Sequence, residues 1–184
     1  YIKNADGRAG MLGQVYPKLE LFRSQFLTWA IASYEALGDI SAASDILRTL
    51  LAERAWQGDL DKFRLWSRKL ASFFIALEDT EQALNVLENC WAAEVADCGV
   101  QLGQVYLSEA RYRDAERIAD GLVGIAGNAR ANVEGTNMLA RIAEQERYDF
   151  DAAVELLLRA YAMANNVDLD PVSDTHLRAH ETKK

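Results

Sequence analysis

The sequence predicts an all-α fold, an α-α superhelix (solenoid) of about four stacked helical hairpins. Apolar residues recur at three- and four-residue intervals along most of the 184 residues, which is the period of an amphipathic helix. Only 2 prolines and 11 glycines interrupt this pattern, so long regular elements are favoured. A similar segment also occurs four times, anchored on Ala43, Ala83, Ala115 and Ala152.

The chain divides into three parts on this pattern. Residues 1–16 are interpreted as a lead-in or the remnant of an upstream repeat, because their three glycines do not have phosphate-binding spacing and no strand precedes them. A repeat domain is expected at 17–164, followed by a disordered tail at 165–184. The expected helices are 17–37, 40–54, 61–78, 80–94, 97–110, 112–125, 129–146 and 149–164.

Each repeat is read as two helices with a short polar break between them. In the first repeat the break is Gly38-Asp39, and in the second it contains Asp79 and Thr80. An Asp or Thr side chain at such a place can accept a hydrogen bond from the first turn of the next helix. No alternating strand pattern of any length is found.

The third repeat carries a family resemblance. Leu102-Gly103, Tyr106, Ala115 and Leu122 stand at the spacing of the tetratricopeptide repeat (TPR) superfamily, which the chain resembles, with degenerate repeats, over roughly residues 24–164. The resemblance implies that Gly103 and Ala115 let two helices approach, while Tyr106 fills the gap to the next repeat. The family's signature tryptophan and inter-repeat proline are absent and the period is irregular, so a related helical-hairpin solenoid remains an alternative.

The resemblance implies a protein-protein interaction scaffold. Its peptide or protein ligand would lie in a concave groove lined by the first helix of each hairpin. The alternative is a regulatory or sensor region of a larger signalling enzyme or transcription regulator whose other domains lie outside this chain. The family's groove positions correspond here to Gln25, Thr28, Glu35, Leu65, Arg68, Ser72, Gln104, Ser108, Glu134, Asn137, Arg141 and Glu144.

Within this set Asn137 and Arg141 lie one helical turn apart, so they can together hold a carboxylate or a backbone carbonyl of the ligand. The basic residues that clamp chaperone C-termini in some TPR proteins do not recur across these helices. For each single position the simpler interpretation is a solvated helix face.

Catalysis, cofactor binding and metal binding are not expected. The only 2 histidines, His176 and His180, lie in the tail, and 2 cysteines alone cannot hold a metal ion. The net charge of −8 and a pI of about 4.8 argue against nucleic acid as a partner. No apolar run approaches the ~20 residues needed to cross a bilayer, so no membrane insertion is expected. The oligomeric state is left open.

The cysteines and aromatic residues are expected inside. Cys90 and Cys98 are interpreted as buried free thiols, with a disulfide as the alternative. Core or inter-repeat packing is expected for the larger aromatic residues, with Trp56 the one most exposed. These residues are Trp29, Trp56, Trp66, Trp91, Tyr34, Phe74 and Tyr106.

Both ends of the chain carry unusual sequence. Residue 1 is Tyr rather than Met, and residues 171–184 resemble a peptide translated from sequencing-adapter DNA. The first observation predicts a processed chain or a fragment, and the second favours a fragment of a bacterial metagenomic reading frame. The alternative for residues 171–184 is an ordinary polar C-terminal tail. Localisation stays open, with the cytoplasm slightly favoured and the periplasm as the alternative, because a signal peptide would have stood before Tyr1.

Overall fold

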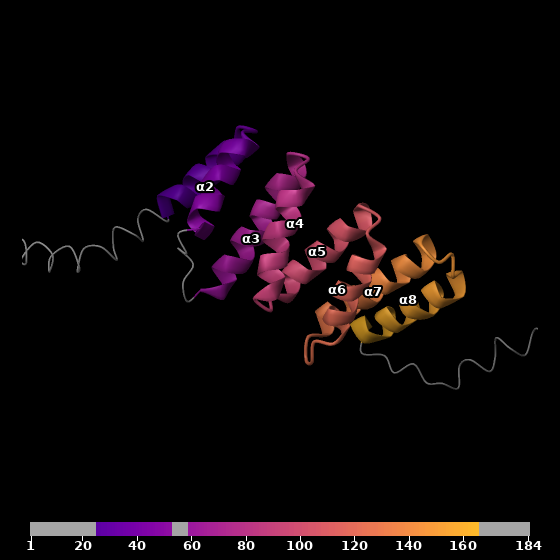
Figure 1. Ribbon diagram of the computed structural model, residues 1–184. Coiled ribbons are helices and arrows are strands. Elements are labelled where there is room, and N and C mark those ends of the chain that lie inside the picture. The colour runs from indigo at the N-terminus through magenta and orange to yellow at the C-terminus, as the bar shows by residue number, and fades with distance from the viewer. Residues whose placement is uncertain (1–24, 53–58, 166–184) are drawn as a thin grey trace, which may run out of the picture. The chain divides into compact units, whose positions relative to one another are not determined.

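The computed structural model describes residues 25–52 and 59–165, and within these ranges it is helical with no strand (Figure 1). The all-α prediction is therefore confirmed. Where both can be compared, predicted and observed helix ends differ by no more than two residues. The helices are 25–36, α2 (Ile40–Ala52), α3 (Leu60–Ala76), α4 (Thr80–Ala92), α5 (Ala96–Ser108), α6 (Tyr112–Val123), α7 (Ala129–Gln145) and α8 (Phe150–Asn165).

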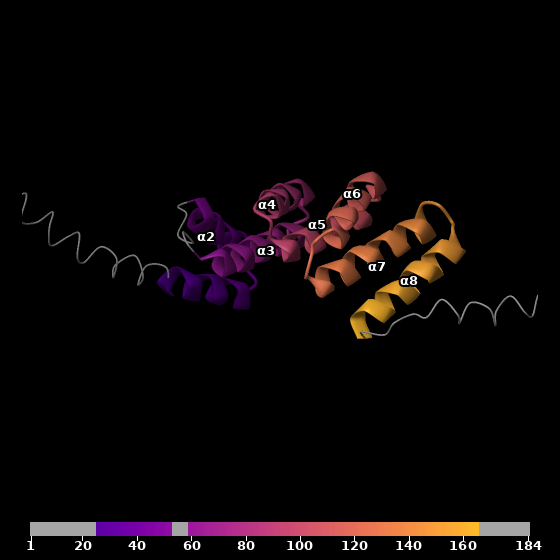
Figure 2. The ribbon, with the colours of Figure 1, turned by 90° about the horizontal axis from the view of Figure 1, so that it is seen from below.

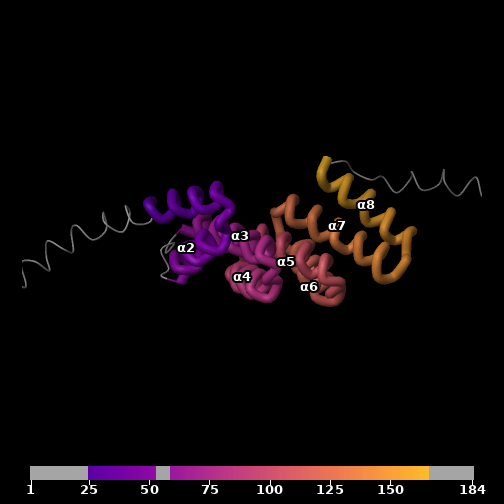
Figure 3. Tube along the Cα trace, turned by 90° about the horizontal axis from the view of Figure 1, so that it is seen from above, coloured from indigo at the N-terminus to yellow at the C-terminus, as the bar shows by residue number. Residues whose placement is uncertain are grey.

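The chain forms two compact units, Tyr1–Val86 and Leu87–Lys184, and the boundary falls within α4. In the first unit α2 packs on α3. In the second unit α5 packs on α6, α6 on α7, and α7 on both α5 and α8. Figures 2 and 3 show α7 and α8 side by side from opposite directions. The expected lead-in at 1–16 and the tail after Asn165 lie outside the described residues.

The turn inside each hairpin contains one residue with a left-handed backbone. These residues are Gly38, Glu78, Ala110 and Tyr148, with φ between 53° and 78°. In the first three hairpins the next backbone N–H donates to a carbonyl five residues earlier, for example from Asp79 to Phe74 at 2.8 Å. This hydrogen bond is the Schellman arrangement, which ends a helix and reverses the chain.

The residue after the left-handed position caps the second helix of the hairpin. The side chains of Asp39, Asp79 and Asp149 accept hydrogen bonds from backbone N–H groups three residues later, at 3.0, 3.2 and 3.0 Å. These bonds satisfy N–H groups that have no partner within the helix. The predicted capping roles of Asp39 and Asp79 are confirmed. In the third hairpin Arg111 takes this position and provides no side-chain cap.

The fourth hairpin differs from the others by one residue in its turn. Four residues separate α7 from α8, whereas three separate α3 from α4 and α5 from α6. Ala153, whose N–H bonds to the carbonyl of Asp149, is therefore the counterpart of Ala43, Ala83 and Ala115. The predicted anchor Ala152 was wrong by one position, because the inserted turn residue shifts the register of α8.

The core of each unit is made of side chains from successive helices. In the first unit Leu47, Leu50 and Leu70 are almost fully buried. In the second unit Leu102, Tyr106, Ile118, Leu122 and Ile142 are almost fully buried. The predicted packing of Tyr106 in the core is confirmed.

Two aromatic residues were placed wrongly. Trp66 and Phe74 are buried as predicted, but Trp29 is 70% exposed and Tyr34 is 38% exposed. The helix 25–36 buries only Ile31 among its described residues. Trp29 is two residues from Ile31, ~200° around the helix, and so lies on the opposite face. Trp56 lies outside the described residues.

Three glycines allow close packing in the second unit. A Cβ added at Gly99 or Gly121 would overlap the ring of Trp91, and one added at Gly135 would lie 2.7 Å from the backbone oxygen of Ala119. Trp91 therefore packs between hairpins, as expected. Gly103 also allows close packing, but what approaches it is the side chain of Met138 from α7 rather than the backbone of α6.

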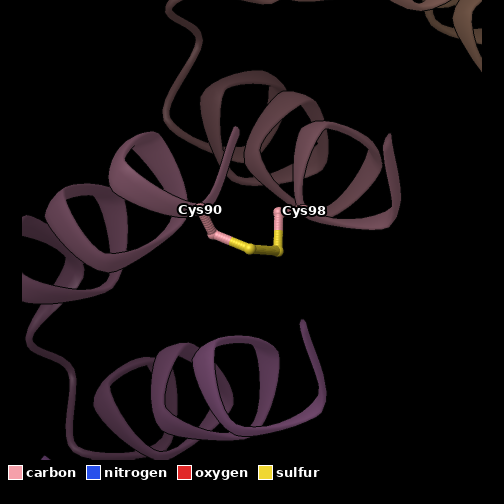
Figure 4. The surroundings of a disulfide bond; sticks show 2 residues. All are labelled: Cys90 and Cys98. Atoms are coloured by element: carbon pink, nitrogen blue, oxygen red, sulfur yellow. A yellow bond between two sulfur atoms is a disulfide. The ribbon is translucent and has the colours of Figure 1, made fainter. Parts of the chain in front are cut away.

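A disulfide joins Cys90 of α4 to Cys98 in the first turn of α5 (Figure 4). Both cysteines are fully buried and their Cα atoms are 5.8 Å apart, within the usual range for a disulfide. The interpretation as free thiols was therefore wrong. The reason is the short turn between α4 and α5: Glu94 has a φ of 62°, and the reversal there brings these two helical positions together.

Candidate protein-binding surface

The predicted groove residues of the first unit have side chains that are exposed or, at Arg68, half-buried. Gln25, Thr28 and Glu35 are exposed on the helix 25–36. On α3, Leu65 and Ser72 are exposed and Arg68 is half-buried. The positions of Leu65, Arg68 and Ser72 are separated by three and four residues, so they form one stripe along α3. Leu65 is the apolar member of this stripe, and its side chain is 62% exposed.

Glu35 is engaged in an ion pair that sequence reasoning missed. The Nζ atom of Lys69 lies 2.5 Å from a carboxylate oxygen of Glu35, which links α3 to the helix 25–36. Lys69 also lies over the ring of Phe73, at 5.6 Å from the centroid. Both charged side chains are partly exposed, so the pair contributes no more than about 1 kcal/mol to stability. No local pattern identifies Lys69, because its partner is 34 residues away.

The predicted residues of the second unit lie on two helices that pack together. Gln104 and Ser108 are exposed on α5. On α7, Arg141 and Glu144 are exposed, and Glu134 and Asn137 are half-buried. These four positions of α7 recur at three- and four-residue intervals and form one stripe.

Helices α5 and α7 meet at a contact between Gly103 and Met138. Gln104 follows Gly103 in the chain, and Asn137 precedes Met138. The structure therefore brings the α5 and α7 candidates onto adjacent helices of one unit. We call Gln104, Ser108, Glu134, Asn137, Arg141 and Glu144 the α5–α7 surface.

The polar groups of these stripes differ in their availability to a ligand. The hydroxyls of Ser72 and Ser108 donate to the backbone oxygens of Arg68 and Val105, at 3.0 and 2.8 Å. In contrast, Asn137 and Arg141 form no side-chain hydrogen bond or ion pair with any residue that the structure describes. Gln104, Glu134 and Glu144 likewise have no such bond among the described residues. Asn137 and Arg141 are the two middle positions of the α7 stripe, and we call them the polar centre of the α5–α7 surface.

Three charged residues, Glu88, Arg111 and Asp114, form a polar cluster at the buried side chain of Tyr106 on α5. Its hydroxyl donates to the carboxylate of Glu88, and the guanidinium of Arg111 lies 4.6 Å from the centre of its ring. Arg111 also donates to Asp114 at 2.9 Å. Burial, together with the hydrogen bond to Glu88, raises the pKa of Tyr106 to about 12. The phenol stays protonated at neutral pH, and the carboxylate of the exposed Glu88 is the acceptor for the hydroxyl of the buried Tyr106.

Two further findings concern the described ranges 25–52 and 59–165. They contain no group of three or more His, Cys, Asp or Glu side chains that could hold a metal ion. None of their helices is both long and apolar enough to cross a membrane. His176 and His180 lie outside these ranges.

Comparison with models of protein families, with curated proteins and with solved structures found no match.

Proposed function

We propose that the chain is a protein-protein interaction scaffold of TPR-like hairpins, which binds a peptide or partner protein across the α5–α7 surface. The observation that carries the proposal is the pair Asn137 and Arg141, one turn apart on α7 and without partners among the described residues. An amide and a guanidinium at this spacing present several donors to one backbone carbonyl or carboxylate of a ligand.

The proposed solenoid rests on features that recur in each hairpin. A left-handed turn residue, a capping position and a buried alanine four residues after the cap occur in the same order four times. Proteins built from such repeated hairpins stack them and bind ligands along an extended surface. The hairpins of this chain are proposed to stack in the same way.

The charges favour a ligand that carries basic residues. Glu134 and Glu144 lie on either side of Arg141 along the α7 stripe, and the whole chain has a net charge of −8. Long-range attraction would speed the approach of a basic peptide, while Arg141 and Asn137 fix its position. In the first unit Leu65 and Arg68 would provide an apolar and a cationic contact.

The experiment selects peptides from a displayed random library and measures the affinity of the selected peptides. Arg141→Ala should weaken binding about 10-fold or more, because a charge-assisted hydrogen bond contributes about 1.5–3 kcal/mol. The control is Arg113→Ala, which removes an exposed arginine of α6 outside this surface. Raising the salt concentration should slow association. Equal affinity for the wild type and an Asn137→Ala/Arg141→Ala variant, both fully folded, would remove the assignment.

A further inference from the structure

Helix α8 carries an apolar strip on its outer face. Five side chains are each 50–65% exposed and recur at intervals of four, three, one and three residues, so they share one face of the helix. We call these residues the α8 strip: Phe150, Val154, Leu157, Leu158 and Tyr161. The helix is anchored by another face, where Ala153 and Ala160 are buried and α8 packs on α7 (Figure 1). The strip is therefore not needed to hold α8 on its own hairpin.

The internal repeats show how unusual this exposure is. Eight residues after the capping position stand Leu47, Leu87, Ala119 and Leu157. The first three are fully buried, whereas Leu157 is half exposed. Tyr161 is likewise the counterpart of Trp91, whose ring packs against Gly99 and Gly121. Helix α8 thus carries exposed apolar residues at positions whose counterparts in the other hairpins are buried or packed against a neighbouring helix.

Leu158 extends the α8 strip beyond the positions that a neighbouring hairpin covers in the other repeats. Nine residues after the capping position, α2, α4 and α6 carry the charged residues Arg48, Glu88 and Asp120, all exposed. The residue of α8 at this position is Leu158. Stacked hairpins leave Arg48 and Asp120 exposed and bond Glu88 to the hydroxyl of Tyr106 in the next hairpin. A leucine can make no such hydrogen bond, so Leu158 indicates an apolar covering surface instead.

We propose that a second copy of this chain covers the α8 strip, through antiparallel pairing of two α8 helices about a two-fold axis. This inference does not depend on the function proposed above. A two-fold interface needs one surface that is complementary to itself, and an uncharged apolar strip along a straight helix meets this condition.

The area of the strip agrees with a weak but specific dimer. An aromatic side chain buries about 150–250 Å² when it is fully covered. At the observed exposures the five side chains expose on the order of 500 Å², so two strips together bury about 1,000 Å². This value assumes that every exposed part of the five side chains is covered, and it lies below the roughly 1,200–2,000 Å² of stable interfaces. It belongs to the range of weak, transient interfaces and predicts a dimer that dissociates on dilution.

The charges on α8 favour the antiparallel orientation. Asp151 and Glu155 lie in the N-terminal half of the helix, and Arg159 lies in the C-terminal half. Antiparallel pairing places the acidic half of one copy beside the basic half of the other, whereas parallel pairing places like charges together. The dipoles of two antiparallel helices point in opposite directions, which also favours this pairing.

The first test measures molar mass by sedimentation over a wide range of protein concentration. The wild type should change from 20.5 kDa to twice that mass as the concentration rises. Leu158→Arg should raise the dissociation constant at least about tenfold. It should leave folding intact, because three equivalent positions already carry charges. The matched control is Leu65→Glu, which adds a charge at another exposed leucine and should leave the dimer unchanged.

A second test reports the orientation by disulfide cross-linking of single added cysteines. In antiparallel pairing about the middle of the strip, Leu157→Cys lies near the axis and should cross-link. Phe150→Cys should not, because the two copies of residue 150 would be about 17 Å apart along the helices. A chain that stays at 20.5 kDa at every concentration, or a dimer that Leu158→Arg does not weaken, would overturn the proposal. Cross-linking of Phe150→Cys would overturn the antiparallel arrangement.

Discussion

Single residues at the hairpin turns hold backbone conformations that most side chains disfavour. Glu78, Ala110 and Tyr148 have positive φ values, although only the first hairpin has glycine at this position. For a residue with a Cβ the left-handed region costs roughly 1–2 kcal/mol. The turns therefore form because the surrounding hydrogen bonds and packing outweigh this cost.

Replacing such a residue with glycine should stabilise the protein. Ala110→Gly removes the steric cost but adds freedom to the unfolded chain, so a net gain of about 1 kcal/mol is expected. The melting temperature should rise by about 2–4 °C for a chain of this size. Ala76→Gly is the control, because Ala76 ends α3 without a positive φ and should lower the melting temperature. A lower melting temperature for Ala110→Gly would contradict the turn geometry.

The contact between Gly135 and α6 gives a second prediction at this scale. Gly135→Ala should destabilise the fold by about 1–3 kcal/mol, because the new methyl group would meet the backbone oxygen of Ala119. Gly124→Ala is the control: its φ is −76° and its nearest contact would be 3.4 Å, so its stability should be unchanged or higher. Denaturant unfolding followed by circular dichroism measures both. Similar stability of the two variants would show that α6 and α7 do not pack this closely.

At the scale of elements, the helices and their caps could be predicted because their signals are local. The helical spacing of apolar residues lies within each helix itself. Asp39 and Asp79 stand directly before the helices that they cap. The shift from Ala152 to Ala153 could not be predicted, because a turn one residue longer leaves a repeat pattern nearly intact. The exposure of Trp29 depends on which helices pack against 25–36, and composition does not carry that information.

The disulfide between α4 and α5 gives a prediction at the same scale. A cross-link that closes a loop of this length stabilises by about 2–3 kcal/mol, mainly by restricting the unfolded chain. A reducing agent should therefore lower the denaturant midpoint of the wild type, whereas a Cys90→Ala/Cys98→Ala variant should unfold at one midpoint in both conditions. Two titratable thiols in the unfolded, non-reduced protein would contradict the disulfide.

At the scale of the whole molecule, the sequence predicted the helical class, which the structure confirms. The binding role of the residues of the α5–α7 surface stays a prediction. The sequence did not show which of those residues are available. Ser108 is bonded to its own helix, while Asn137 and Arg141 are not bonded to any described residue. It also missed the α8 strip, because apolar residues at helical spacing read as core unless the covering helix is known.

The two proposed surfaces predict opposite behaviour for two variants. Arg141→Ala lies in the α5–α7 surface and should weaken peptide binding but leave the dimer unchanged. Leu158→Arg should weaken the dimer but leave peptide affinity per chain unchanged. Each variant is thus a control for the other, and failure of one proposal can be told apart from failure of the other.

The central claim is that a ligand binds across the α5–α7 surface, and amide chemical-shift mapping tests it most directly. A selected peptide is titrated into isotope-labelled protein, and the shifts of the backbone amides are followed. The account predicts that the largest changes lie at Gln104, Ser108, Asn137 and Arg141, with saturation at the affinity measured for the same peptide. Changes confined to α6 and α8, with these four amides unmoved at saturation, would contradict it.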